Sequence, residues 1–160
     1  MVPSTPTAGA VAILGLAGAW LPDAAQAARS CEEWSAEVSA VEGLVEIRRT
    51  ATVAWAVLAA GERVCTDDSV RVGRSSRATL ILPDGGDLRL DELTTLNLPE
   101  PPSAAGTLIE LLRGIIHVIS RDPRSLSFRT PYANAGLEGT EFDIRVDASQ
   151  QLTELVVLEG

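Results

Sequence analysis

The stretch RATLILPDGGDLRLDELTTLNL, residues 77–98, decides the fold class of this chain. A Leu-x-Leu unit recurs in it every eight residues, at 80/82, 88/90 and 96/98, and mostly polar residues alternate with the leucines. Side chains alternate between the two faces of a β-strand, whereas an amphipathic helix repeats every three or four residues. The leucines are therefore predicted to lie on one face of three short strands, which stack consecutively as a meander or as rungs of a solenoid.

Turn signals and further apolar runs extend this pattern over the chain. The segment 83–86 (Pro-Asp-Gly-Gly) predicts a tight turn, because glycine tolerates positive φ and proline cannot donate a ladder hydrogen bond. Arg113-Gly114 is predicted to be a hairpin corner, 31–40 an extended segment or a single turn, and 99–103 a surface loop. Additional strands are predicted at 44–48, 69–72, 108–112, 115–120, 126–129, 142–146 and 152–158.

The many short strands predict an all-β fold, either a short-strand β-solenoid or β-roll or a twisted sandwich. Aromatic residues make up 4% of the chain, so the core is expected to be a thin layer of leucine, valine and isoleucine.

The N-terminal segment predicts an export signal. Residues 8–21 form an uncharged apolar run of about 14 residues, which is short of the about 20 that span a bilayer and typical of a signal peptide. Ala25-Gln26-Ala27 provides the small-x-small pattern that precedes cleavage. We expect a signal-peptide helix at 1–27 and a β domain at 28–160 that is incomplete at its C-terminus. The segment before the run has no lysine or arginine, so a buried helix of a cytosolic domain is the alternative.

Composition excludes several function classes. The chain has 160 residues with 13 arginines, no lysine and 22 acidic residues, for a formal charge of −9. An acidic surface repels a phosphate backbone, which argues against nucleic-acid binding. Two cysteines and one histidine are too few for a zinc site of cysteine and histidine ligands. No phosphate-binding glycine loop or nucleophile elbow occurs, and we predict no metal, no cofactor and no catalytic residue.

Both cysteines, Cys31 and Cys65, follow the expected cleavage site. Two thiols of one small exported domain most often form a disulfide, and closing a loop of about 35 residues contributes about 3–4 kcal/mol in the chain-entropy model. Two buried, unpaired thiols are the alternative.

The sequence contains three groups of side chains that are candidate sites. His117 is predicted to lie on a strand face, because the sequence shows no orienting partner for a catalytic base. Trp34 and Trp55 either cover the open end of the core or line a sugar-binding face. Four acidic residues do not match the spacing of a calcium loop and are predicted to belong to a solvated turn: Asp84, Asp87, Asp91 and Glu92.

The order of the motifs resembles the FecR-like periplasmic domain over residues 41–160, and exported members with a cysteine pair are the most similar. The motifs are G-x-V-x-x-R from Gly43, Trp55, G-x-x-V-x-T-x-D from Gly61, L-x-L-x-D-G from Leu80, Arg113-Gly114, T-P-x-A from Thr130, G-T-x-F from Gly139, and a final L-x-G. The resemblance implies structural roles for thirteen signature residues: Gly43, Trp55, Gly61, Asp68, Asp84, Gly85, Gly114, Thr130, Pro131, Gly139, Thr140, Phe142 and Gly160.

The leading hypothesis is an exported, non-enzymatic module, periplasmic or secreted, that binds an envelope protein or envelope ligand through strand edges or a sheet face. The alternative, which the resemblance implies, is the periplasmic sensor domain of an iron-uptake-type signalling pathway with a sigma and an anti-sigma factor. About 27 residues upstream are too few for an anti-sigma segment and a transmembrane helix, so no membrane span is expected after signal cleavage. A cell-wall-active enzyme is the third hypothesis.

Cleavage of the export signal gives the first testable prediction. N-terminal sequencing of the protein recovered from the periplasm or medium is expected to begin near Ala28, because Ala25-Gln26-Ala27 fits the specificity of signal peptidase. An intact Met1 would contradict the prediction.

Overall fold

The computed structural model describes residues 31, 33–100, 103, 106–120, 126–137 and 141–159, so the predicted signal peptide lies outside the described residues. The described part contains thirteen strands and no helix, which confirms the predicted all-β class. The strands are β1 (Trp34–Glu42), β2 (Val45–Arg48), β3 (Ala56–Val57), β4 (Arg63–Cys65), β5 (Ser69–Val72), β6 (Arg77–Ile81), β7 (Asp87–Leu90), β8 (Thr95–Asn97), β9 (Thr107–Ile119), β10 (Leu126–Arg129), β11 (Asn134–Leu137), β12 (Glu141–Asp147) and β13 (Leu152–Glu159).

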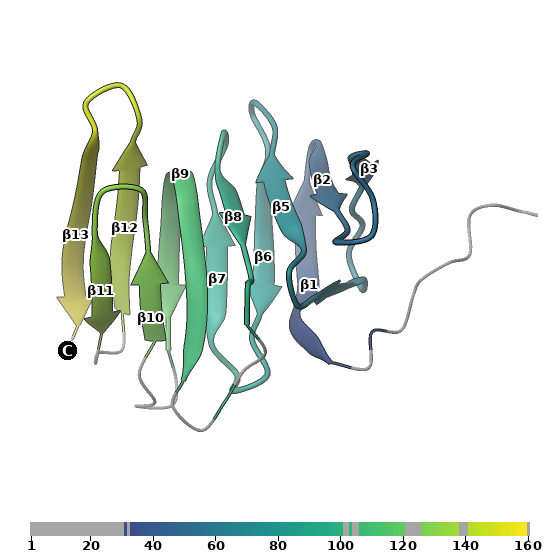
Figure 1. Ribbon diagram of the computed structural model, residues 1–160, viewed down its shortest axis with the longest axis horizontal. Coiled ribbons are helices and arrows are strands. Elements are labelled where there is room, and N and C mark those ends of the chain that lie inside the picture. Colours follow the sequence, from purple (N-terminus) through teal and green to yellow (C-terminus); the bar gives the residue numbers. More distant parts are fainter. Residues whose placement is uncertain are drawn as a thin grey trace, which may run out of the picture.

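The strands run across the long axis of the molecule, and the chain advances along that axis from β1–β3 at one end to β11 and β13 at the other (Figure 1). They form a curled sheet with two walls. Wall A has the order β4-β1-β6-β7-β9-β12-β13, and wall B has the order β3-β2-β5-β8-β9-β10-β11. Strand β9 belongs to both walls. All these pairs are antiparallel except the parallel pair β9–β10.

The repeated leucines line the core, as the sequence predicts. All six leucines of the three units are at most 1% exposed. The first two units form the hairpin β6–β7 in wall A, with Leu80 opposite Leu88. The third unit departs from the predicted consecutive stacking, because β8 pairs with β5 and β9 in wall B instead of with β7. The chain crosses between the walls around Leu93, which has a positive φ of 60°. Leucines from both walls therefore contribute to one core.

The predicted hairpin corner at Arg113-Gly114 is wrong, because β9 continues through it from Thr107 to Ile119. Its first half pairs with β8 and β10 in wall B, and its second half with β7 and β12 in wall A. Gly114 lies at the junction with a φ of +97°, and a Cβ there would lie 2.4 Å from the Cα of Thr94. The Thr94 hydroxyl accepts a hydrogen bond from the Ile115 N–H and donates one to the Ile115 carbonyl. The strand therefore bends at Gly114 but does not turn back, and each half pairs with strands of a different wall.

The segment 31–40, predicted to be extended or a single turn, is extended from Trp34, where the nine-residue strand β1 begins. Other differences concern short strands. Strands β3, β4 and β11, of two, three and four residues, were not predicted, because their sequences show no alternation of apolar and polar residues. Pairing with a neighbouring strand determines such elements.

The two walls also meet through an aromatic pair near the C-terminal end. Phe128 of wall B and Phe142 of wall A are 2% and 1% exposed. Their ring centroids lie 5.6 Å apart with an interplanar angle of 85°, the edge-to-face geometry that aromatic quadrupoles favour. The signature residue Phe142 therefore packs in the core between the walls.

No helix among the described residues is both long enough and apolar enough to cross a membrane.

The bend of β9 gives the second prediction. Gly114→Ala is expected to lower the free energy of unfolding by roughly 2–4 kcal/mol, because the new methyl group meets the backbone of Thr94 and an L-residue is strained at this φ. Urea unfolding measures the change. Gly136→Ala is the matched control, since a Cβ at Gly136 meets nothing within 4 Å. An equal effect at the two glycines would contradict the role given to the bend.

Candidate functional site

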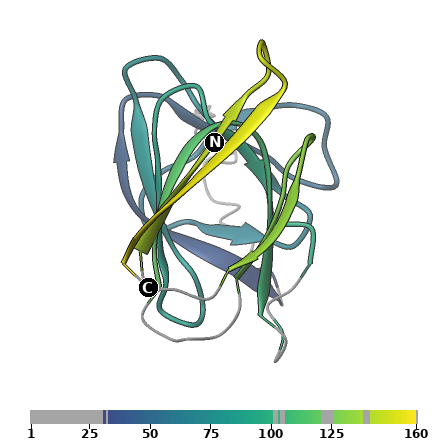
Figure 2. The same cartoon turned by 90° about the vertical axis from the view of Figure 1, so that its left-hand side faces the viewer.

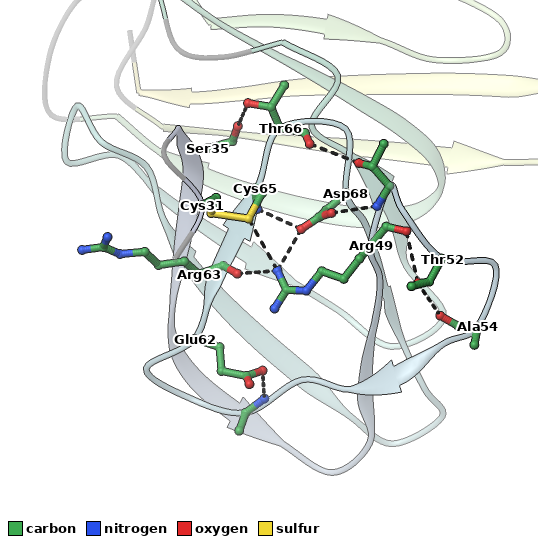
Figure 3. A network of polar contacts seen from close by, with 12 residues as sticks. Cys31, Ser35, Arg49, Thr52, Ala54, Glu62, Arg63, Cys65, Thr66 and Asp68 are labelled. Atoms are coloured by element: carbon green, nitrogen blue, oxygen red, sulfur yellow. Dashed lines mark hydrogen bonds and ion pairs between the residues drawn. A yellow bond between two sulfur atoms is a disulfide. The ribbon is translucent and has the colours of Figure 1, made fainter. Parts of the chain in front are cut away.

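Asp68 forms a polar cluster with the loops at the N-terminal end of the molecule (Figure 3). Its side chain is 2% exposed and lies 2.8 Å from the Arg49 guanidinium. The carboxylate also accepts hydrogen bonds from the backbone N–H groups of Cys65 (2.9 Å) and Thr50 (3.1 Å). A buried charge needs such partners, and here they join the turn after β4 to the loop after β2. The signature residue Asp68 therefore holds two loops together.

The predicted disulfide between Cys31 and Cys65 is present beside this cluster, with 5.7 Å between the Cα atoms. It ties the residues before β1 to β4, while Arg49 also donates a hydrogen bond to the Arg63 carbonyl (2.7 Å). The Arg63 guanidinium in turn lies over the Trp34 ring, 5.3 Å from its centroid. The disulfide and these side-chain contacts tie the segments at the N-terminal end to one another.

Trp55 packs under two arginines of wall B. The guanidinium carbons of Arg71 and Arg48 lie 4.2 Å and 5.0 Å from the ring centroid. Glu46 accepts two hydrogen bonds from Arg71, at 2.6 Å and 3.0 Å, which lower the pKa of Glu46 and raise that of Arg71. The Trp55 ring therefore stacks against arginine side chains of the same chain.

The remaining described signature residues lie in turns along the molecule. Gly43 precedes β2 with a φ of +76°, and a Cβ there would meet Ser76 Oγ at 2.3 Å. Gly61 donates its N–H to the Val38 carbonyl before β4. Asp84 and Gly85 form the β6–β7 turn, in which the Asp84 carboxylate accepts a hydrogen bond from the Gly86 N–H.

Thr130 organises the turn between β10 and β11, where Pro131 is exposed. Its hydroxyl accepts hydrogen bonds from the N–H groups of Tyr132 (3.2 Å) and Ala133 (2.9 Å) and lies 2.7 Å from the Thr153 hydroxyl of β13. Gly139, Thr140 and Gly160 lie outside the described residues. The described signature residues are thus spread from end to end and do not converge on one site.

His117 has two acidic partners that the sequence did not reveal. Its Nδ1 lies 2.5 Å from Asp143 and its Nε2 3.1 Å from Glu141, both on the neighbouring strand β12. Asp143 and His117 are direct cross-strand neighbours in the register of β9 and β12. Asp143 and Glu141 thus face the two ring nitrogens of His117 from the neighbouring strand, and these contacts join β12 to β9.

The outer face of wall A has a hollow of about 400 Å³, and His117 is among the residues that line it. Side chains of both charges line it: Arg77 and Arg89 are positive, and Glu42 and Asp91 are negative. The four acidic residues considered for a calcium loop do not converge there, since Glu92 accepts a hydrogen bond from the Ser75 N–H and Asp84 caps its own turn. Among the described residues, no group of three or more His, Cys, Asp or Glu side chains is arranged to hold a metal ion.

Strand β13 forms the C-terminal edge of wall A and, among the described strands, pairs only with β12. Leu155 and Val157 lie opposite the buried residues Ile144 and Phe142, so they face the core side, yet they are 38% and 55% exposed. Val156 points to the other side and is 44% exposed, and Leu158, where the register of β12 and β13 shifts, is 53% exposed. Figure 2 looks at this end, where the hairpins β12–β13 and β10–β11 terminate the two walls. An apolar edge strand with exposed backbone is a surface suited to strand addition.

The buried ion pair gives the third prediction. Asp68→Asn is expected to cost about 3–5 kcal/mol of unfolding free energy, because the Arg49 charge loses its partner in a buried setting. Asp91→Asn is the control, since Asp91 and Arg77 are exposed and 3.6 Å apart, and its cost should stay within about 1 kcal/mol. Denaturant unfolding compares the two, and similar costs would contradict the role of Asp68.

The Glu46–Arg71 pair gives the fourth prediction. The folded pKa of Glu46 is lowered, so its charged form stabilises the protein above the unfolded pKa and that contribution disappears as the pH falls through the folded pKa. Glu46→Gln is expected to destabilise the protein at neutral pH, and the difference from wild type should vanish in acid. Unfolding curves measured from neutral pH to about pH 3 follow it. A difference that does not change with pH would contradict the assignment.

Comparison with known proteins agrees with the resemblance in the sequence. The family model "FecR protein" matches residues 68–160, more than half of the chain, and the match begins at the buried Asp68. No curated protein and no solved structure matches the chain. The motifs from Gly43 to Gly61 precede the matched range, although the same curled sheet contains them. The chain therefore belongs to the FecR protein family.

Proposed function

We propose that this chain is an exported, non-enzymatic module of the cell envelope that binds a partner protein through the outer edge of β13. Among the described strands, β13 has an apolar outer edge to which no strand is paired, and this observation carries the proposal. β13 spans eight residues, Leu152–Glu159, and contains neither lysine nor proline, the residues that commonly block strand addition. An extended segment of a partner could add to it as the next strand of wall A.

The family supports a regulatory role over an enzymatic one, because FecR proteins form a regulatory and signalling family. The polar clusters support the same view. Asp68 and Thr130 use their side chains to hold loops, and His117 is occupied by two carboxylates. The side chains of Asp68, Thr130 and His117 thus each make contacts that hold parts of the fold together.

Export is supported by two independent features. The apolar run at 8–21 and the small-residue pattern at 25–27 are typical of a signal peptide. The Cys31–Cys65 disulfide is of the kind that persists in an oxidising compartment such as the periplasm.

The second candidate function is a sensor domain in an envelope signalling pathway, and the family match favours it. The two candidates share the binding edge and differ in the partner. A receptor or regulator at β13 would support the sensor role, whereas a structural envelope protein would support a module without signalling.

In-cell photo-cross-linking provides the fifth prediction. A photoreactive residue at Val156 is expected to form a covalent adduct with a protein, because the side chain is exposed on the edge strand. Val53, which is 94% exposed in the loop before β3, is the control position and should form none. Mass spectrometry of the adduct identifies the partner. Absence of any adduct at Val156 would contradict binding at this edge.

A further inference from the structure

The segment 50–61, which leads from β2 through β3 to β4, contains no charged residue. Val53 and Val57 in it are 94% and 70% exposed. Five alanines of the segment are exposed as well, at positions 51, 54, 56, 59 and 60. Soluble proteins rarely expose large apolar patches, and such patches mark sites of interaction with proteins or membranes. We infer that this segment, the apolar loop, inserts into the surface of a phospholipid bilayer.

Contacts on its inner side hold the apolar loop in a defined conformation. Leu58 is 1% exposed, and its N–H donates a hydrogen bond to the Val45 carbonyl (2.9 Å). The Ala59 N–H donates one to the Glu62 carboxylate (3.1 Å), and β3 pairs with β2. Burial of Leu58 in the core therefore fixes the segment, while Val57 next to it stays exposed.

The threonines of the apolar loop use their hydroxyl groups within the protein. The Thr50 hydroxyl donates a hydrogen bond to the Thr66 carbonyl (3.3 Å). The Thr52 hydroxyl contacts the carbonyls of Arg49 (3.3 Å) and Ala54 (3.4 Å), as Figure 3 shows. Protein interfaces and sugar sites both depend on polar groups that point at the partner. A bilayer surface is bound mainly through apolar area, so it fits this loop better.

Trp55 of the loop and Arg48 beside it have the arrangement that a bilayer surface favours. The Arg48 guanidinium carbon lies 5.0 Å from the centroid of the Trp55 ring. Tryptophan is enriched at the membrane–water interface, and arginine binds phosphate groups through several N–H donors. Arg48 is exposed and donates one hydrogen bond to Ser69, but among the described residues it forms no ion pair, whereas Glu46 neutralises Arg71. The charge of Arg48 is therefore free for a headgroup phosphate.

The net charge of −9 decides which lipids suit the loop. A strongly anionic surface repels an acidic protein, whereas a surface of mainly zwitterionic lipids offers phosphates to Arg48 with little net repulsion. Contact therefore depends on apolar insertion. It is expected to persist in salt, because salt screens charges and does not weaken apolar burial.

Vesicles of phosphatidylethanolamine with a minor share of phosphatidylglycerol test the inference. The probe is a polarity-sensitive fluorophore on Val53→Cys, whose thiol is the only free one because the two native cysteines form a disulfide. Vesicles are expected to shift its emission to shorter wavelength, and brominated acyl chains are expected to quench it. Tyr132→Cys is the matched control, since Tyr132 is 40% exposed in the turn between β10 and β11, and it should show neither change.

Two double variants change the apolar surface alone. Val53→Asp with Val57→Asp is expected to weaken vesicle binding at least about tenfold, because a carboxylate that enters the bilayer surface loses hydration. Val53→Leu with Val57→Leu adds two methylene groups and should strengthen binding about tenfold. Both valines are exposed, so the variants should keep the wild-type circular dichroism spectrum. Flotation with the vesicles measures binding, and residues 1–27, where retained, contribute equally to every variant.

Equal flotation of the wild type and the Val53→Asp/Val57→Asp variant would overturn the inference, and so would binding that high salt abolishes. In cells, a photoreactive residue at Val53 is expected to cross-link to lipid, and a protein adduct there would also overturn it. The apolar loop and β13 lie at opposite ends of the molecule (Figure 1), so the adduct at Val156 tests the proposed function separately. Each of the two can fail while the other holds.

Discussion

Strand β9 holds the molecule together because it belongs to both walls. Its first half pairs with β8 and β10, and its second half pairs with β7 and β12. The two walls can face each other only if this strand bends between the halves. Gly114 permits the bend by adopting a φ of +97° where a side chain would collide with Thr94. The buried leucines of β7 and β8 reach one core because the shared strand brings their walls together.

The two ends of the molecule are finished in different ways. The N-terminal end is tied by the Cys31–Cys65 disulfide and by the hydrogen bonds of the buried Asp68. The C-terminal end of wall A is the apolar edge strand β13, whose core-facing residues remain exposed.

His117 shows how a side chain that looks isolated in sequence acquires a structural task. Asp143 and Glu141 contact its two ring nitrogens from β12, the strand that pairs with β13. The Thr130 hydroxyl reaches Thr153 of β13 from wall B. Polar contacts from both walls thus hold the hairpin β12–β13 in position.

The sequence by itself determined the strands whose periodicity is local. The Leu-x-Leu units, the Asp84-Gly85 turn and the strands at 69–72 and 126–129 all follow from neighbouring residues, and the structure has them. The order of its motifs also identified the family. Only the tertiary structure decided that β9 continues through Gly114, that β8 joins the opposite wall, and that Asp68 and His117 find Arg49 and Asp143. Such pairings depend on residues distant in the chain, and alternation along one strand carries no information about which strand lies beside it.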